Sequence, residues 1–263
     1  MAQTIAVLSQ KGGTGKTTAV RTLTDVLRGA GLRTLAVDLD PQGNLSDYFD
    51  LPTDVAPTIA DVLAGRAQAA EAVHDDIIPA SLSLAEAELM LGGKMGRELT
   101  LKRALKDVAD RYDVVLIDCP PSLGLLTINA LVAADHALIT AEAQYFALQG
   151  VEQAMEVVEL ARDSLNPQLK LLGVLLNLAD MRTIHSREAL VSLKERFGSD
   201  VFETIIRASI AYAESAERAV SIIDHRPTLG ADYVSLAKEI LTRLPDLGTL
   251  DGRLAALPQS STT

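Results

Sequence analysis

The chain has 263 residues, of which 48% are apolar, and a formal net charge of −11. The length suits one large domain with a buried core, and the acidic balance excludes nucleic-acid binding through the whole surface, so a DNA contact needs a local basic patch. One cysteine, Cys119, excludes an internal disulfide and a cysteine-ligated cluster, and no apolar run approaches the roughly 18 residues of a membrane span, so we expect a cytoplasmic protein.

Strand-like apolar runs alternate with helical patterns, which predicts an α/β fold with a mostly parallel twisted sheet and helices on both faces. The expected strands are Thr4–Ser9, Arg33–Asp38, Val114–Ile117, His136–Thr140 and Leu171–Asn177. The expected helices are Lys16–Ala30, Thr58–Ala64, Leu99–Arg111, Ala147–Ser164, Ser186–Phe197 and Ala231–Leu244. No repeat or linker divides the chain, so we expect one domain over residues 1–244 and a poorly ordered tail over residues 245–263.

The first expected strand runs into a glycine-rich segment, Lys11-Gly-Gly-Thr-Gly-Lys-Thr-Thr18, which opens the first expected helix. Such a turn presents backbone N–H groups and the positive end of the helix dipole to an anion. Lys16 can reach the β- and γ-phosphates of a nucleotide, and the Thr17 hydroxyl can bind Mg²⁺. We therefore expect a nucleoside triphosphate to be held by Lys11, Gly12, Gly13, Thr14, Gly15, Lys16, Thr17 and Thr18.

This loop departs from the usual P-loop pattern, because Gln10 stands where a glycine is expected and a second lysine, Lys11, precedes the glycines. Since Lys16 serves the nucleotide of its own subunit, Lys11 at the lip is free to reach another γ-phosphate. The loop resembles that of the ParA/MinD group of P-loop ATPases with a deviant Walker A motif. The resemblance implies that Lys11 crosses a dimer interface to the partner's phosphates, so that ATP joins two subunits. A lysine kept at the lip for solubility is the alternative interpretation.

Two acidic motifs end expected strands, where open α/β sheets place ligand chemistry. Asp38 and Asp40 are two residues apart, so they face the same way on an extended strand. The resemblance implies that Asp40 orients or activates the attacking water and that Asp38 helps to hold the Mg²⁺ shell. Asp118 closes the apolar run Val114–Ile117, which is typical of a Walker B motif, so we expect it to bind Mg²⁺ through water. Aspartates that merely cap turns are the alternative.

These residues predict slow, Mg²⁺-dependent hydrolysis of ATP to ADP and phosphate. Lys16, Mg²⁺ and the partner's Lys11 would stabilise the charge of the phosphoryl transition state. No basic residue in the loop can activate water strongly, and a single carboxylate is a weak base. The catalytic residues that we expect are Lys11, Lys16 and Asp40.

The resemblance covers about the first 244 residues and extends to ParA-type chromosome or plasmid partition ATPases that lack a helix-turn-helix domain. Beyond the loop it is carried by Asp38–Asn44, Asp118–Gly124, Leu175–Thr183, Val201–Arg207 and Leu229–Glu239. It implies that Asn177, Arg207 and Ala208 flank the adenine, although a buried Asn177 that satisfies backbone groups is an equal alternative. It also implies an ATP-bound homodimer and a ParB-like partner that accelerates turnover.

The chain departs from its relatives at arginines that are thought to hold nonspecific double-stranded DNA. Relatives usually have Arg-Asn where this chain has Arg207-Ala208, and commonly an arginine where Leu229 stands. Arg207, Arg218 and Arg226 remain as candidates, with solvated helix faces as the alternative. DNA binding should need ATP, because dimerisation doubles a weak patch, and it would place the ATP form on the nucleoid.

Other functional classes of ATPase with this fold match the sequence less well. A MinD-like division-site regulator would need a basic amphipathic C-terminal helix for the membrane surface, whereas residues 247–257 contain one arginine and one aspartate, so we expect no membrane partner. A metabolic amide-forming ligase shares the fold, but Lys11 and the C-terminal match favour ParA. The nearest rival is an orphan ParA-like ATPase that positions a protein cluster or an organelle.

Overall fold

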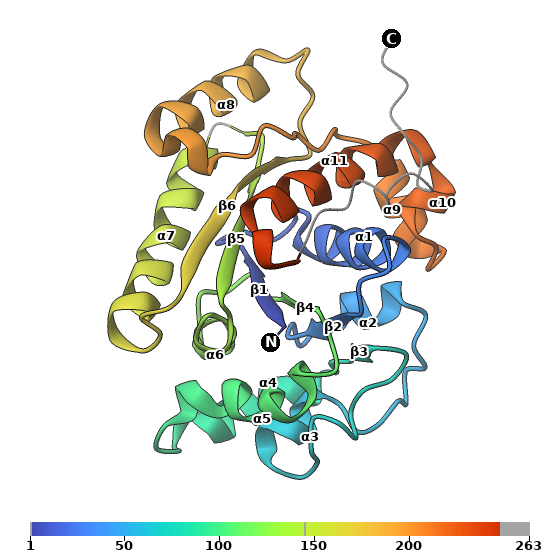
Figure 1. The fold of residues 1–263 in the computed structure, drawn as a ribbon, viewed down its shortest axis with the longest axis vertical. Coiled ribbons are helices and arrows are strands. Elements are labelled where there is room, and N and C mark those ends of the chain that lie inside the picture. The colour runs from blue at the N-terminus through green and yellow to red at the C-terminus, as the bar shows by residue number, and fades with distance from the viewer. Residues whose placement is uncertain (1, 145, 248–263) are drawn as a thin grey trace.

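Six parallel strands form one sheet within residues 2–144 and 146–247, which are the residues that the computed structural model describes. The strand order is β3-β2-β4-β1-β5-β6, and every neighbouring pair is parallel. The strands are β1 (Gln3–Leu8), β2 (Thr34–Asp38), β3 (Ile77–Ile78), β4 (Val114–Asp118), β5 (His136–Glu142) and β6 (Lys170–Asn177). Because all strands run the same way, their carboxyl ends meet at one edge of the sheet (Figure 1).

Helices cover both faces of the sheet, which confirms the predicted α/β fold (Figure 1). One face is covered by α3 (Ile59–Ala64), α4 (Ser83–Gly92), α5 (Thr100–Ala109), α6 (Leu125–Ala133) and α7 (Ala147–Ser164), with α8 (Ile184–Phe197) beyond them. The other face is covered by α1 (Lys16–Gly29), α2 (Asn44–Tyr48), α9 (Ala211–Glu217), α10 (Ile222–His225) and α11 (Pro227–Arg243).

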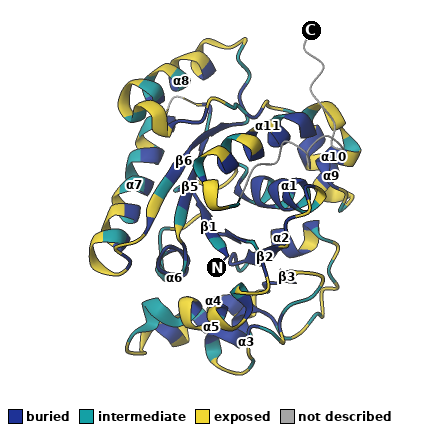
Figure 2. Cartoon of the chain, in the orientation of Figure 1, coloured by how far each residue is buried: buried dark blue, intermediate teal, exposed yellow. Residues whose placement is uncertain are grey.

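The core divides into two apolar layers because the strands are buried on both sides (Figure 2). In β1, Ile5 and Val7 point into the layer under α1 and α11, whereas Ala6 and Leu8 point into the layer under α3–α7. Alternate side chains of a strand face opposite sides, so a strand covered on both faces has to be apolar throughout. This requirement explains why continuous apolar runs marked the strands in the sequence.

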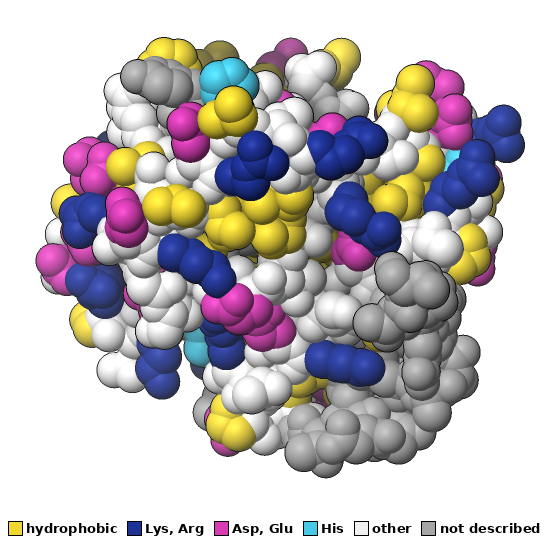
Figure 3. Space-filling model, turned by 90° about the horizontal axis from the view of Figure 1, so that it is seen from above, with side chains coloured by type: hydrophobic (Ala, Val, Ile, Leu, Met, Phe, Trp, Pro, Cys, Tyr) yellow, Lys and Arg dark blue, Asp and Glu magenta, His cyan; other side chains and the backbone are white. Residues whose placement is uncertain are grey.

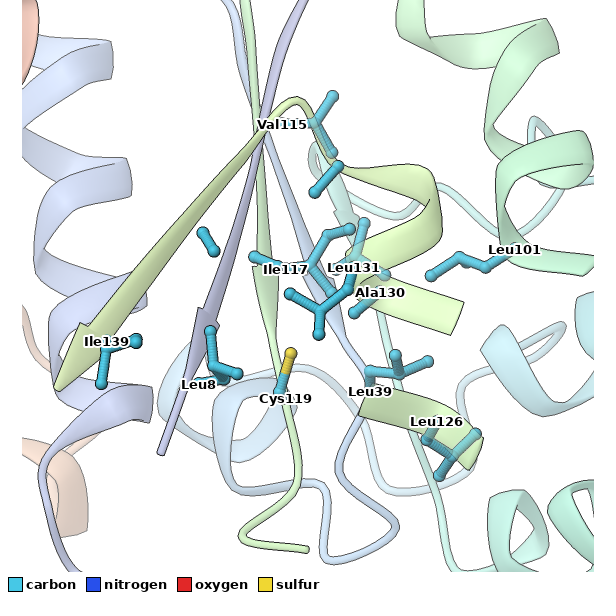
Figure 4. Close-up of a cluster of buried hydrophobic side chains, with 14 of the residues drawn as sticks. Leu8, Leu39, Leu101, Val115, Ile117, Cys119, Leu126, Ala130, Leu131 and Ile139 are labelled. Carbon is cyan, nitrogen blue, oxygen red and sulfur yellow. The ribbon is translucent and has the colours of Figure 1, made fainter. Parts of the chain in front are cut away.

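Cys119 lies in the second of these layers, between Leu8 and Leu39 (Figure 4). It follows Asp118 at the end of β4, and because side chains alternate, its thiol enters the core while the neighbouring carboxylate turns the other way. Burial raises the pKa of the Cys119 thiol, so the thiol stays protonated and unreactive.

All five predicted strands and six predicted helices are present, with ends shifted by a few residues. The sequence patterns did not predict β3, α2, α4, α6, α9 or α10. Several of these elements are very short, and α6 reads Leu-Leu-Thr-Ile-Asn-Ala-Leu-Val-Ala, which is apolar on nearly all sides and has no helical period.

At the C-terminal end, Pro245–Leu247 forms a short 3₁₀ helix, although we expected residues from 245 onward to lack stable order. The rest of the predicted tail, residues 248–263, lies outside the described residues. Across the described part of the chain, no helix combines the length and apolar character that crossing a bilayer requires.

Candidate nucleotide-binding and hydrolysis site

The loop between β1 and α1 is shaped by two glycines. Gly13 and Gly15 have φ angles of 76° and 78°, in the left-handed region that residues with a Cβ rarely adopt. Helix α1 begins directly afterwards at Lys16, so its free N–H groups and positive dipole end face the loop. Residues 11–15 thus form a turn that leads into the first turn of α1, an arrangement that fits a phosphate group.

Lys16 is buried, and its ammonium lies over the loop. Nζ donates to Ser9 Oγ at 3.1 Å and to the Lys11 carbonyl oxygen at 3.4 Å. Burial lowers the pKa of Lys16, and the nearby carboxylates of Asp118 and Asp40 act in the opposite direction. The side chain therefore places a cation at the mouth of the turn.

Asp118 and Thr17 meet at the end of β4, as expected for a Mg²⁺ site. Thr17 Oγ1 donates to Asp118 Oδ2 at 2.7 Å, and Asp118 Oδ1 is buried without a hydrogen-bond partner among the described residues. Burial and the adjacent Asp38 carboxylate raise the pKa of Asp118 to about 8. The unpaired Asp118 Oδ1 beside the Thr17 hydroxyl suits a Mg²⁺ ion that keeps several of its waters. Such an ion needs only one or two protein oxygens besides those of the phosphates.

This buried carboxylate predicts that the ligand-free chain is less stable in mild base. Because folding raises the pKa of Asp118 from 3.8 to about 8, the protonated carboxyl group contributes to the free energy of unfolding. This contribution is complete below pH 3.8 and is lost as the pH rises through 8. Between about pH 6 and pH 8, with a chelator and no nucleotide, the free energy of unfolding in urea should fall by on the order of 1 kcal/mol. Asp118→Asn should remove most of that slope, because Asn keeps the hydrogen bond from Thr17 without the charge. The exposed control Asp107→Asn should keep the slope, and an equal slope in all three proteins would contradict the prediction.

Asp38 lies beside Asp118 in the neighbouring strand, and its two oxygens hold the segment that follows β2. Asp38 Oδ1 accepts the Asp40 N–H at 3.1 Å, and Oδ2 accepts the Ser46 N–H at 2.9 Å and the Ser46 hydroxyl at 2.7 Å. Burial raises the pKa of Asp38 to about 6. These contacts anchor residues 40–46, and the place of Asp38 in the Mg²⁺ shell stays a prediction. Sequence reasoning missed Ser46, although a buried strand-end carboxylate needs such a donor.

Asp40 is nearly buried and lines the same cleft as Lys16 and Thr17. One of its carboxylate oxygens, Oδ1, accepts the Gln42 N–H at 3.0 Å, which fixes the side chain at the start of the turn that leads to α2. The position therefore fits a carboxylate that faces the phosphates of a bound nucleotide.

Asn177, at the end of β6, holds the phosphate loop through hydrogen bonds to its backbone. Its Nδ2 donates to the carbonyl oxygens of Thr14 at 2.9 Å and Gly15 at 3.3 Å, and its Oδ1 accepts the Leu178 N–H at 2.9 Å. These contacts correspond to the alternative in which Asn177 satisfies backbone groups. Both N–H donors of the amide are used, so an adenine contact would fall to the second lone pair of Oδ1.

The close approach of Asn177 predicts different effects for two loop glycines. A Cβ added to Gly15 would lie 2.4 Å from Asn177 Nδ2, whereas a Cβ on Gly13 would meet nothing within 4 Å. Gly13→Ala should therefore cost only the left-handed backbone penalty of about 1–2 kcal/mol. Gly15→Ala should cost roughly 1–3 kcal/mol more, because the clash displaces Asn177. Urea unfolding of both variants measures the difference, and equal losses would contradict the contact.

An open cleft of about 960 Å³ lies beside the loop, with α2 on one side and α9 on the other. Besides the loop residues and Asp40, its walls include Tyr48 from α2 and Leu178, Ser209 and Tyr212 from the segments after β6. The predicted adenine residues Arg207 and Ala208 adjoin Ser209 in sequence but do not line the cleft. The sequence contained no local signal for Leu178, Ser209 or Tyr212.

The three candidate DNA-binding arginines differ in their surroundings. Arg207 forms a two-pronged ion pair with Asp232, at 2.8 and 3.0 Å, and also donates to the Thr228 carbonyl. Arg218 and Arg226 are exposed, next to α9 and α11, and neither pairs with a carboxylate of the described residues. Figure 3 views the edge at which the strands end. On the part of this face that the described residues form, Lys and Arg side chains lie separately around hydrophobic ones and do not gather into one basic patch.

Comparisons with known proteins identify the family. A family model described as an AAA domain matches residues 2–171. Sporulation initiation inhibitor protein Soj of Bacillus subtilis is 39% identical over 249 residues, which cover 91% of this chain and 98% of that protein. Chromosome partitioning protein ParA of Myxococcus xanthus is 36% identical over 91% of this chain and 88% of its own length. The chain belongs to the ParA/Soj family. The resemblance inferred from the loop lysines is thereby confirmed.

A solved structure similar to this ParA/Soj chain is that of Mycobacterium smegmatis cobyrinic acid a,c-diamide synthase with a bound ATP analogue and magnesium. It is 34% identical, covers 100% of both chains and has a TM-score of 0.77. Proteins with different named activities thus share this fold, so the function has to be argued from the site.

Proposed function

We propose that this ParA/Soj chain is a slow, Mg²⁺-dependent ATP hydrolase that acts as a dimerising switch in chromosome or plasmid partition. The observation that carries the proposal is the contrast between its two loop lysines. The Lys16 ammonium is buried over the loop of its own subunit, whereas Lys11 is exposed at the rim. One cation is thus committed to the subunit's own nucleotide, and the other is available to a second subunit.

The residues of the site support hydrolysis. Mg²⁺, held by Thr17 and by Asp118 through water, would neutralise charge on the phosphates. Lys16 and the loop N–H groups would bind the β- and γ-phosphates, and Asp40 would orient the water that attacks the γ-phosphate. Since one carboxylate is a weak base, we expect slow turnover until a ParB-like partner accelerates it.

The named relatives favour partition over the rival functions. Soj and ParA match nearly the whole chain, and chromosome partitioning is part of the name of the second. The M. smegmatis structure carries the name of an amide-forming enzyme, which is the activity of that protein. An orphan ParA-like ATPase that positions a protein cluster is the second candidate for this chain.

ATP-dependent binding of duplex DNA is tested with variants of Arg218 and Arg226. Nonspecific duplex DNA should shift in a gel at low salt with ATP and Mg²⁺ and should not shift without ATP. The double variant Arg218→Ala, Arg226→Ala should weaken binding about 10-fold or more, because phosphate contacts dominate affinity. Arg103→Ala, on α5 at the other face of the sheet, is the matched control. Binding that is absent or independent of ATP would contradict the nucleoid-bound switch.

A further inference from the structure

The main chain and the side chain of Lys11 are held by different parts of the molecule. Its carbonyl oxygen accepts hydrogen bonds from Ser9 Oγ at 2.8 Å and from Lys16 Nζ at 3.4 Å, which fix the backbone within the loop. Its side chain runs toward the start of α7, where Nζ lies 5.0 Å from the centroid of the Phe146 ring. Only the side chain is therefore free to move while the loop keeps its shape.

The Lys11 side chain lies against the Phe146 ring and is not among the residues that line the nucleotide cleft. The cleft is lined by Gly12, Gly13 and residues 15–18. A separate small cavity of about 20 Å³ is lined by Ser9, Lys11 and Thr14 together with Phe146 from α7. Lys16 thus lines the nucleotide cleft, whereas Lys11 lines the small cavity.

The contact is one that the lysine can leave. In the part of the chain that the structure describes, no carboxylate forms an ion pair with Lys11. A ring face attracts an ammonium through its quadrupole and leaves the positive charge in place. The Phe146 side chain is 54% exposed, so the contact is shallow and the cation stays partly hydrated. A carboxylate at this place would instead compete with a phosphate for the same charge.

We propose that Phe146 is a positioning residue for Lys11: its ring holds the ammonium at the rim of the free subunit and releases it when the ammonium crosses to the partner's phosphates. The inference rests on the proposed ATP-dependent dimer. Because the ring contact exists in the free subunit and is given up on pairing, it opposes dimerisation. Each dimer gives up two such contacts, one from each subunit.

The ring contact is tested in the free subunit by the proton shifts of the Lys11 side chain. Protons that lie over an aromatic face move upfield, so the Lys11 Cε protons should show an upfield shift in protein with labelled lysine. Lys11→Ala assigns the signal, and Phe146→Leu should return it to the position of an exposed lysine. A signal that is unchanged by Phe146→Leu would overturn the contact, whether or not the protein dimerises.

The consequence for pairing is tested by sedimentation velocity with AMP-PNP and Mg²⁺. Phe146→Leu should lower the protein concentration of half-dimerisation by about 5- to 30-fold, which corresponds to two exposed cation–π contacts. Phe146→Trp should raise it, since the indole face attracts a cation more strongly. Leu160→Ala, at another exposed apolar position on α7, should match the wild type.

The outcomes separate the two proposals. A wild-type chain that stays single with AMP-PNP and Mg²⁺ overturns the proposed function and this inference with it. A wild-type dimer whose midpoint is the same in Phe146→Leu, or is raised by that change, overturns the inference alone. A midpoint raised by Phe146→Leu would mean that the ring stabilises the dimer as part of its interface.

Discussion

Lys16→Ala is expected to raise the Kd for ATP by at least about 100-fold, because it removes a buried charge-assisted contact to the phosphates. Among the described residues that line the cleft, Lys16 is the only lysine or arginine, and it stands against Asp40, Asp47, Asp50 and Glu217. Without this ammonium, the walls of the cleft would repel a triphosphate. Calorimetric titration of ATP with Mg²⁺ measures the loss.

The control for this prediction is Lys102→Ala, an exposed lysine on α5 that is far from the loop in the fold. It should bind ATP as the wild type does. Circular dichroism should show that Lys16→Ala keeps its helices, since a cation whose pKa is lowered by burial does not hold the fold together. ATP affinity within about 10-fold of the wild type would contradict the place given to Lys16.

Asp40→Ala is expected to lower the rate of ATP hydrolysis by about 100-fold or more while ATP binding and dimerisation persist. The reason is that Asp40 lines the cleft with its Oδ1 fixed by the Gln42 N–H and holds no other described element in place. Removal of Asp40 should therefore change the attacking water and leave the phosphate loop intact. Single-turnover release of phosphate, followed after mixing with ATP and Mg²⁺, separates chemistry from product release.

Asp47→Ala is the matched control, because Asp47 is an exposed aspartate on the wall of the same cleft. It should hydrolyse ATP within about 3-fold of the wild type, as expected for a surface carboxylate without a role in the reaction. If Asp40→Ala turned over ATP normally, Asp40 would not be the residue that orients the water. If Asp47→Ala were equally impaired, the charge of the cleft rather than Asp40 would set the rate.

Elements and residues with local signals could be predicted from the sequence. The buried strands can be recognised as apolar runs because both of their faces are covered by helices. The phosphate loop can be recognised because its residues are contiguous in the chain. Asp38, Asp40 and Asp118 could be placed at one edge because each lies at the carboxyl end of a strand in a parallel sheet. Helix α6 could not be found in the same way, since a helix buried on nearly all sides loses the 3.6-residue period.

Contacts between distant segments could not be predicted. Asn177 reaches the loop carbonyls across 163 residues of sequence, and its amide would suit a nucleotide base equally well. Ser46 meets Asp38 only because the chain turns back into α2. The ring of Phe146 meets Lys11 because β5 lies beside β1 and delivers the start of α7 next to the loop. Such pairs depend on strand order, which no single stretch of sequence encodes.

Light scattering shows directly whether two subunits share ATP through Lys11, because it gives the molar mass of the particle. With a non-cleavable ATP analogue and Mg²⁺, the wild type should form particles of two chains, and Lys11→Ala should stay a single chain that still binds the analogue. With ADP, both proteins should be single chains. A wild-type particle that holds one chain at saturating analogue and high protein concentration would show that Lys11 does not join two subunits through ATP.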